Sequence, residues 1–248
     1  MIKAKLKAAL IHALITLFVA VITAVLVYGV WYPGEFAQML SGTDLYLLVL
    51  MVELCLGPLI SLVIYNPNKP RAELIRDYSI VGVVQLAALA YGLYAVALSR
   101  PVYLVFVKDR IEVIAATELK TGDLNLVKDE SFKSLSWFGP RSICTESPTD
   151  PEEKSDLLFS ALAGKDIQLM PKYYRECHSQ EVINKSIAKY VLFASGAIKT
   201  TDLPPKFQAI DFKWLPVMTR FGNGIVVYEN NSVESPTYIN VDPYLIPK

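Results

Sequence analysis

Three long stretches of the chain are almost free of charged side chains. Residues 8–34 and 78–99 contain no Asp, Glu, Lys or Arg, and residues 45–68 contain only Glu53. A helix of about 20 apolar residues crosses the hydrocarbon core of a bilayer, and each stretch exceeds that length. The pattern therefore predicts a membrane protein with three transmembrane helices within residues 1–99.

Basic residues in the short connections predict the orientation of these spans. They precede the first span and lie again between the second and third: Lys3, Lys5, Lys7, Lys69, Arg71 and Arg76. The connection at residues 31–44 has no Lys or Arg. Lys and Arg near span ends are retained on the cytoplasmic side. We therefore expect a multi-pass protein of a bacterial inner membrane, with a cytoplasmic N-terminus and everything after the third span in the periplasm.

A cleaved signal peptide is the competing interpretation of the N-terminus, because basic residues precede an apolar stretch there. The apolar core of a signal peptide usually has about 7–15 residues, and a small-x-small cleavage site follows it. The stretch at residues 8–34 is longer, and no such site clearly ends it. We therefore favour an uncleaved membrane anchor.

Residues 100–248 are long enough for one ordinary soluble domain, and the first part of this region favours a mixture of strands and helices. Residues 102–107 and 111–116 are rich in β-branched and aromatic residues around a short polar turn, which predicts a hairpin. Asp150 followed by Pro151 is typical of a helix start, and Gly164 of a helix stop. A helix over residues 151–163 follows.

The rest of the domain continues this mixture. Apolar residues at helical spacing predict one further helix from Ser179 to near Gly196. Residues 222–224 read Gly-Asn-Gly and separate two runs typical of strands, at 214–221 and 225–229, and a last strand is expected to end near Val241. We therefore predict three transmembrane α-helices (residues 1–99) followed by a periplasmic α+β domain (residues 100–248) with a largely antiparallel sheet.

Cysteine usage agrees with a periplasmic location for that domain. Cys144 and Cys177 are its two cysteines, and an oxidising compartment would let them pair. We favour a disulfide over two free buried thiols, although sequence alone does not give their separation. His178 beside Cys177 is a poor zinc signal, because no second close ligand pair accompanies it.

Chemistry-bearing motifs are scarce along the chain. No Ser/His/Asp arrangement, phosphate-binding glycine loop or paired intramembrane carboxylates can be recognised. Acidic and basic residues balance in the domain, which gives no reason to expect nucleic acid as a partner. We therefore expect a protein that is not an enzyme and that binds no cofactor or metal.

Glu53 is the residue that most calls for explanation. It lies near the middle of the second span, where a charge costs about 2.5–3.5 kcal/mol, so it should be neutral, paired or facing protein. Thr23 in the first span and Gln85 in the third are candidate partners, although Gln85 would meet Glu53 only if the helices tilt. Two readings stay open: a polar clasp within the bundle, or a docking point for the transmembrane helix of another protein.

Gly57 and Pro58 interrupt the same span four residues later. Proline removes a backbone donor and kinks a helix, and glycine permits the close approach of a neighbour. A harmless bend is the simpler interpretation, since such bends are common in membrane helices. A kink beside a buried acid also leaves backbone carbonyls free to bond a partner.

Four runs stand out in the region 53–106: ELCLGPLISL (53–62), YNP (65–67), QLAALAYG (85–92) and RPVYLVF (100–106), with Asp77 between them. In these runs the chain resembles the TfpX/TfpZ family of type IV pilin accessory proteins. The resemblance runs from end to end and is strongest in this region. Family members often carry an aspartate where this chain has Glu53, which keeps the acid and moves it outward by one methylene.

This resemblance implies a non-enzymatic inner-membrane protein that accompanies one major pilin and supports pilus assembly and twitching motility. Its expected partners are the lipid bilayer, a cognate type IV major pilin and the inner-membrane pilus assembly machinery. Pilins have an apolar N-terminal helix that waits in the membrane before polymerisation. Glu53, Gly57, Pro58 and Gln85 are the residues we expect to contact that helix, in the manner of a chaperone.

Two other functions are compatible with the sequence. The first is a membrane-anchored sensor or regulatory protein whose periplasmic domain binds a small ligand. It would have only the short N-terminus and the connection around residues 66–77 with which to signal in the cytoplasm. The second is a membrane hydrolase with an unrecognised catalytic arrangement.

Overall fold

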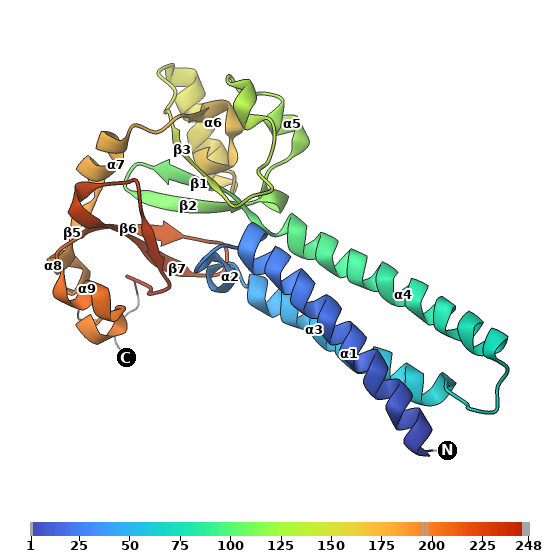
Figure 1. Ribbon diagram of the computed structural model, residues 1–248. Coiled ribbons are helices and arrows are strands. Elements are labelled where there is room, and N and C mark those ends of the chain that lie inside the picture. Colours follow the sequence, from blue (N-terminus) through green and yellow to red (C-terminus); the bar gives the residue numbers. More distant parts are fainter. Residues whose placement is uncertain (1, 195, 197, 245–248) are drawn as a thin grey trace. The chain divides into compact units, whose positions relative to one another are not determined.

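The computed structural model describes residues 2–194, 196 and 198–244, and the chain divides into two compact units. The helical unit comprises the chain up to Trp31 together with Gly42–Leu98. The sheet unit comprises Tyr32–Ser41 and the chain from Ser99 onward. Figure 1 shows the long helices of the first unit and the strands of the second.

The helical unit confirms the three predicted spans. Helix α1 (Ile2–Leu26) continues into a π-helical turn, η1 (Val27–Trp31), and is followed by α3 (Gly42–Ile64) and α4 (Arg71–Leu98). Each is long and apolar enough to cross a membrane. Helices α1 and α4 both pack against α3. Most of their large apolar side chains remain exposed, as expected of surfaces that face lipid.

The buried face of α3 is a single stripe of residues three or four positions apart: Gly42, Tyr46, Val49, Glu53, Gly57 and Ser61. This spacing places them on one side of the helix, toward α1 and α4. The hydroxyl groups of Tyr46 and Thr23 lie 2.7 Å apart, and the Tyr46 hydroxyl also donates to the carbonyl of Ala20. Gly92 on α4 completes the packing, since a side-chain carbon there would collide with Val49.

The sheet unit is built on a mixed sheet with the order β4-β3-β1-β2-β6-β7-β8 and with β5 paired to β6. Its strands are β1 (Pro101–Val107), β2 (Arg110–Ala115), β3 (Arg141–Thr145), β4 (Tyr174–Arg175), β5 (Ile187–Ala188), β6 (Lys213–Met218), β7 (Asn223–Tyr228) and β8 (Thr237–Ile239). The β1–β3 and β2–β6 pairings are parallel, and the others are antiparallel. The predicted α+β class and both predicted hairpins, β1–β2 and β6–β7, are confirmed.

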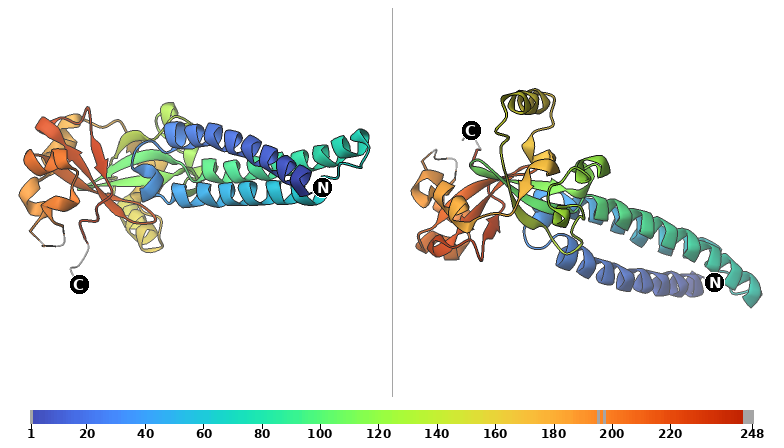
Figure 2. Two further views of the ribbon diagram at one scale, coloured as in Figure 1. Left: turned by 60° about the horizontal axis from the view of Figure 1, so that its bottom comes forward. Right: turned by 90° about the horizontal axis from the view of Figure 1, so that it is seen from above.

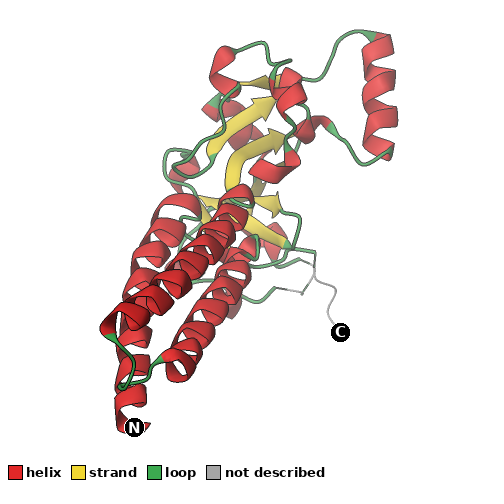
Figure 3. Ribbon diagram, turned by 90° about the vertical axis from the view of Figure 1, so that its right-hand side faces the viewer, coloured by secondary structure: helices red, strands yellow, loops and turns green. Residues whose placement is uncertain are grey.

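Short helices surround this sheet: α2 (Phe36–Met39), α5 (Thr121–Leu124), α6 (Pro151–Leu162), α7 (Ser179–Lys185), α8 (Lys189–Leu192) and α9 (Pro205–Ala209). Helix α6 confirms the helix predicted over 151–163, and the Asp150 carboxylate accepts a hydrogen bond from the Glu153 backbone at its start. Figures 2 and 3 show α6 standing away from the sheet on loops at both ends. None of its residues is buried.

The single helix predicted from Ser179 to near Gly196 is wrong. Helix α7 ends at Lys185, and the hydroxyl of Ser186 donates to the carbonyl of Ile183, which competes with helix continuation. The next two residues pair with β6 as strand β5, and α8 then begins separately. The spacing of apolar residues is compatible with one continuous helix and with two short helices separated by a strand. Pairing of β5 with β6 selects the second arrangement.

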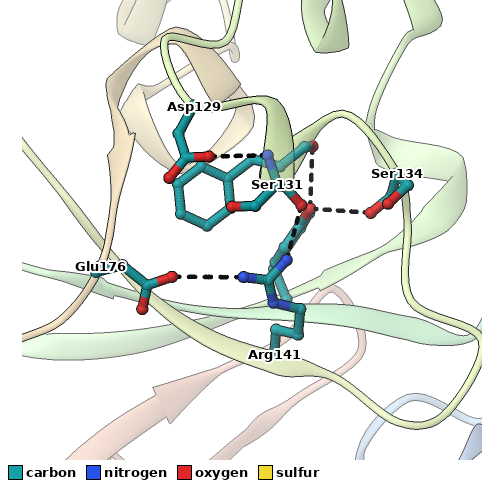
Figure 4. Close-up of polar contacts among 7 residues, drawn as sticks. Asp129, Ser131, Ser134, Arg141 and Glu176 are labelled. Atoms are coloured by element: carbon teal, nitrogen blue, oxygen red, sulfur yellow. Dashed lines mark hydrogen bonds and ion pairs between the residues drawn. The ribbon is translucent and has the colours of Figure 1, made fainter.

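Covalent and polar contacts fix the edge of the sheet near β3. Cys144 and Cys177 form a disulfide, with their Cα atoms 4.9 Å apart. Arg141 at the start of β3 donates to the carbonyl of Ser131 over 2.7 Å and lies 3.5 Å from the Glu176 carboxylate (Figure 4). The hydrogen bond from Arg141 to Ser131 holds the long connection between β2 and β3 against the sheet.

The connection between the first two spans is part of the sheet unit, although the sequence placed it with the membrane helices. The rings of Phe36 and Tyr238 pack 4.8 Å apart, and Phe36, Met39 and Leu40 are buried. The Thr219 hydroxyl donates to the carbonyl of Met39 over 2.8 Å. Sequence patterns did not indicate this packing, because it depends on residues far apart in the chain.

Candidate functional site

The helical unit contains a cavity of about 510 Å³ between α1, α3 and α4. Its wall is mainly apolar, with polar side chains at a few positions: His12, Thr16, Glu53, Tyr65, Tyr78 and Gln85. Ile15 on α1 and Leu86 on α4 also line it, and each side chain is more than half exposed. The cavity therefore has an apolar rim contributed by two different helices.

His12 joins the three helices within this cavity. Its Nε2 lies 2.9 Å from Oε1 of Gln85 on α4, and its Nδ1 lies 2.6 Å from Oγ of Ser61 on α3. A carboxamide oxygen only accepts, so Nε2 carries the proton and donates to Gln85. In the neutral ring, Nδ1 then accepts from the Ser61 hydroxyl. One side chain from each span thus takes part in a connected polar cluster.

Glu53 is 8 % exposed and lines the same cavity as His12. Among the residues that the structure describes, its carboxylate has no hydrogen bond or ion pair. Neither predicted partner bonds it, because Thr23 pairs with Tyr46 and Gln85 pairs with His12. The acid therefore faces the cavity without a donor from its own bundle.

Gly57 and Pro58 have different roles beside this cluster. A side-chain carbon at Gly57 would lie 2.7 Å from Nε2 of Gln85 and 2.9 Å from Nε2 of His12. Glycine is thus the residue that leaves room for the His12 to Gln85 hydrogen bond. Pro58 lies inside α3, which continues through it to Ile64, and the carbonyl of Leu54 loses its usual helical donor there.

His12 is the site residue that the sequence analysis did not predict. A polar side chain in an otherwise apolar span is a signal in itself, because it must find a partner or lie near a membrane surface. The sequence does not say how each helix is rotated about its axis, so Ser61 and Gln85 could not be assigned to it. Within residues 2–194, 196 and 198–244, no group of three or more His, Cys, Asp or Glu side chains could hold a metal ion.

Comparison with known proteins gives a consistent set of relatives. The family model described as "Fimbrial assembly protein FimB" matches residues 1–41. The fimbrial assembly protein of serogroup I from Dichelobacter nodosus is 33 % identical over 161 residues, which cover 65 % of this chain and 62 % of that protein. The serogroup E1 protein of the same organism is 26 % identical over 242 residues, which cover 94 % of both chains.

A third relative, the fimbrial assembly protein of serogroups C1 and C2 of Dichelobacter nodosus, is 35 % identical over 114 residues. The match covers 46 % of this chain and 87 % of that protein. No solved structure matches the chain. A relative that is 35 % identical over 87 % of its length shows the family. The chain therefore belongs to the family of fimbrial assembly proteins.

Proposed function

We propose that this protein is an accessory protein for a cognate type IV major pilin, acting as a membrane chaperone or assembly modulator. The names of its relatives support a role in fimbrial assembly. The resemblance to the TfpX/TfpZ family supports a pilin as the partner, and pilus assembly and twitching motility as the processes served. The observation that carries the proposal is the cavity of the helical unit, with Glu53 in its wall.

The cavity suits the apolar N-terminal helix of a pilin. Helices α1 and α4 both pack on α3, and the cavity separates their facing sides. Ile15 and Leu86 form apolar rims that a fourth helix would cover. Association of helices within lipid depends on close packing and on polar contacts, and the site offers both an apolar wall and a buried polar cluster.

Glu53 supplies a reason for selective docking. A buried carboxyl group without a hydrogen-bond donor is costly in an apolar environment. A donor on the incoming helix would remove that cost, so the gain on docking exceeds what apolar contact alone supplies. His12 and Gln85 already bond each other, so among the described residues of the cavity wall Glu53 and the buried Tyr78 hydroxyl remain without a hydrogen-bond partner.

The proposal places the protein in a bacterial inner membrane, with a cytoplasmic N-terminus and a periplasmic sheet unit. The basic residues near the first span and between the second and third support this orientation. Tyr32–Ser41 packs within the sheet unit, which supports placing this connection and the rest of the sheet unit on the same side of the membrane. There the sheet unit would meet the globular head of the pilin, and we assign it no catalytic step.

Site-specific photocrosslinking in cells that make the cognate pilin tests this function. A photoreactive amino acid would replace Ile15 or Leu86 on the cavity rim. Leu10 and Ile80 are matched controls on the outer faces of the same two helices, where both side chains are exposed. We expect crosslinks to the pilin from positions 15 and 86 and none from positions 10 and 80. Equal crosslinking at all four positions, or none at any, would contradict docking in the cavity.

Substitution of Glu53 separates its role from that of the apolar wall. We expect Glu53→Gln and Glu53→Leu to reduce the amount of pilin that co-purifies with the protein. Cys55→Ala is the control, because Cys55 is exposed on the same helix. Unchanged co-purification from both Glu53 variants would refute the docking role of this residue. Crosslinks to assembly-machinery components in place of pilin would identify a different partner.

A further inference from the structure

Two loops of the sheet unit lie beside the segments through which the chain enters and leaves the membrane helices. The first is the loop at residues 134–140, between β2 and β3. Arg100 Nε donates to the carbonyl of Ser136 over 3.0 Å, and the Arg100 guanidinium carbon lies 4.0 Å from the centre of the Trp137 ring. Arg100 follows the last residue of α4, Leu98, by two positions. Two residues span at most about 7 Å, so this loop adjoins the end of the third span.

The same loop adjoins the end of the first span. A side-chain carbon at Gly139 would lie 3.3 Å from Cγ of Pro33. Pro33 follows the last residue of the first transmembrane helix, Trp31, by two positions. Gly139 has a positive φ of 70°, which directs the chain through this close approach. The loop at 134–140 therefore contacts Arg100 and Pro33, each of which follows the last residue of a span by two positions.

The second loop, at residues 219–222, joins β6 to β7 and adjoins the remaining span. The Thr219 hydroxyl donates to the carbonyl of Met39 over 2.8 Å and also lies 2.9 Å from the carbonyl of Gly222. Met39 precedes Gly42, the first residue of α3, by three positions. The Thr219 side chain thus bonds this loop to Met39, three positions before the second span begins.

Both loops present large aromatic side chains to their surroundings. Trp137 is 56 % exposed, Phe138 is 87 % exposed and Phe221 is 61 % exposed. Arg220, beside Phe221, is exposed as well. Aromatic rings gather at the boundary between lipid and water because an apolar ring surface and the polar headgroup layer both suit that depth. Basic side chains are favoured there by the phosphate groups.

We propose that the loops at 134–140 and 219–222 form a lipid-contacting rim, in which Trp137, Phe138 and Phe221 enter the interfacial layer of the bilayer. The partner is the membrane surface around the span ends. Burial of these rings would fix the depth of the sheet unit at the membrane, in addition to its covalent attachment through the three spans. The headgroup layer on one side of a bilayer is about 5–8 Å thick, which matches the short chain distance from the span ends.

Spin-label accessibility in the full-length protein tests this rim. Phe138→Cys and Phe221→Cys would be made in a Cys55→Ala background that keeps the Cys144–Cys177 disulfide, labelled with a nitroxide and reconstituted into phosphatidylcholine vesicles. Tyr190→Cys is the matched control, because Tyr190 is exposed in α8. Helix α8 follows β5, which pairs with the Lys213–Trp214 end of β6, opposite to the end that leads to Thr219.

Collisions with oxygen, which concentrates in lipid, are compared with collisions with a water-soluble nickel chelate. We expect the ratio of oxygen to nickel accessibility at positions 138 and 221 to exceed that at position 190 several-fold. Position 190 supplies the reference value for a label in water. A ratio at either position 138 or 221 equal to that at position 190 would overturn the proposal.

Discussion

Nδ1 of His12 and Oγ of Ser61 lie 2.6 Å apart, although 49 positions separate the two residues in the chain. This contact joins the first two spans at a point where both are otherwise apolar. The histidine ring also bonds Gln85 on the third span, so it is the common member of the cluster. The ring of His12 therefore bonds one residue on each of the other two spans.

The strength of this contact can be measured with a double-mutant cycle. We expect His12→Ala and Ser61→Ala, singly and together, to show a coupling free energy of about 0.6 kcal/mol, and up to ~1.7 kcal/mol, as for other hydrogen bonds between membrane helices. Unfolding by SDS in mixed micelles gives the free energies. Ser79→Ala on the exposed face of α4 is the control and should leave stability unchanged. Additive effects of the two cluster substitutions would show that the contact contributes nothing.

Close packing between α3 and α4 gives a second prediction. A side-chain carbon at Gly92 would lie 2.8 Å from both Cγ atoms of Val49, and a β-branched side chain cannot easily turn away. We expect Gly92→Ala to destabilise the helical unit by about 1–3 kcal/mol through overpacking. Gly82→Ala is the control on the same helix, because nothing lies within 4 Å of a side-chain carbon there.

The same SDS unfolding experiment measures both glycine variants. Gly82→Ala should be neutral or slightly stabilising, since alanine is the better helix former. Equal free energies of unfolding for the two variants would mean that α3 and α4 do not pack as closely as the contact of Gly92 with Val49 requires.

Local signals predicted those parts of the fold that depend on neighbouring residues. The near absence of charge from three long stretches was enough to place the spans, and Asp150 followed by Pro151 located the start of α6. The hairpins were predictable because turn residues separate strand-like runs, although Asn223, expected in the second turn, pairs with Met218 as the first residue of β7. In each case the determining interactions lie within a few positions of one another.

Features that depend on rotation or long-range pairing were not predictable. Apolar length places a span but leaves its rotation undetermined, so His12 was overlooked and Glu53 was assigned partners that bond other residues. The interruption after Lys185 arises from pairing of Ile187 with Trp214 across the sheet. The packing of Phe36 on Tyr238 joins segments about 200 positions apart, and no local pattern encodes it.

The grouping of Tyr32–Ser41 with the sheet unit predicts the topology of the chain across the membrane. Gln38 and Asn68 are exposed and lie in the first and second connections between spans. In a Cys55→Ala background, we expect Gln38→Cys to react with a membrane-impermeant maleimide in cells with a permeabilised outer membrane. Asn68→Cys should react only after the inner membrane is lysed, because an odd number of spans separates the two.

Phe159→Cys in the sheet unit is the companion variant for this test, since Phe159 is exposed on α6. It should react under the same conditions as Gln38→Cys. Different labelling of positions 38 and 159 would contradict a common side for the first connection and the sheet unit. Labelling of position 68 before lysis of the inner membrane would contradict a cytoplasmic second connection, and with it the proposed orientation.

The disulfide between Cys144 and Cys177 encloses α6 and is expected to stabilise the sheet unit. The two residues are 33 positions apart, and a cross-link closing a loop of that size contributes about 3–4 kcal/mol through the unfolded state. We expect the double variant Cys144→Ser/Cys177→Ser to lower the thermal unfolding temperature of the detergent-solubilised protein, followed by near-ultraviolet circular dichroism. Reduction of the unmodified protein should produce the same shift in unfolding temperature. Cys55→Ala should produce no shift, because Cys55 is a free cysteine and takes no part in the disulfide. If the double variant and the unmodified protein unfold at one temperature, the loop containing α6 does not depend on the cross-link, and contacts such as that of Arg141 with Ser131 are sufficient to hold this edge of the sheet.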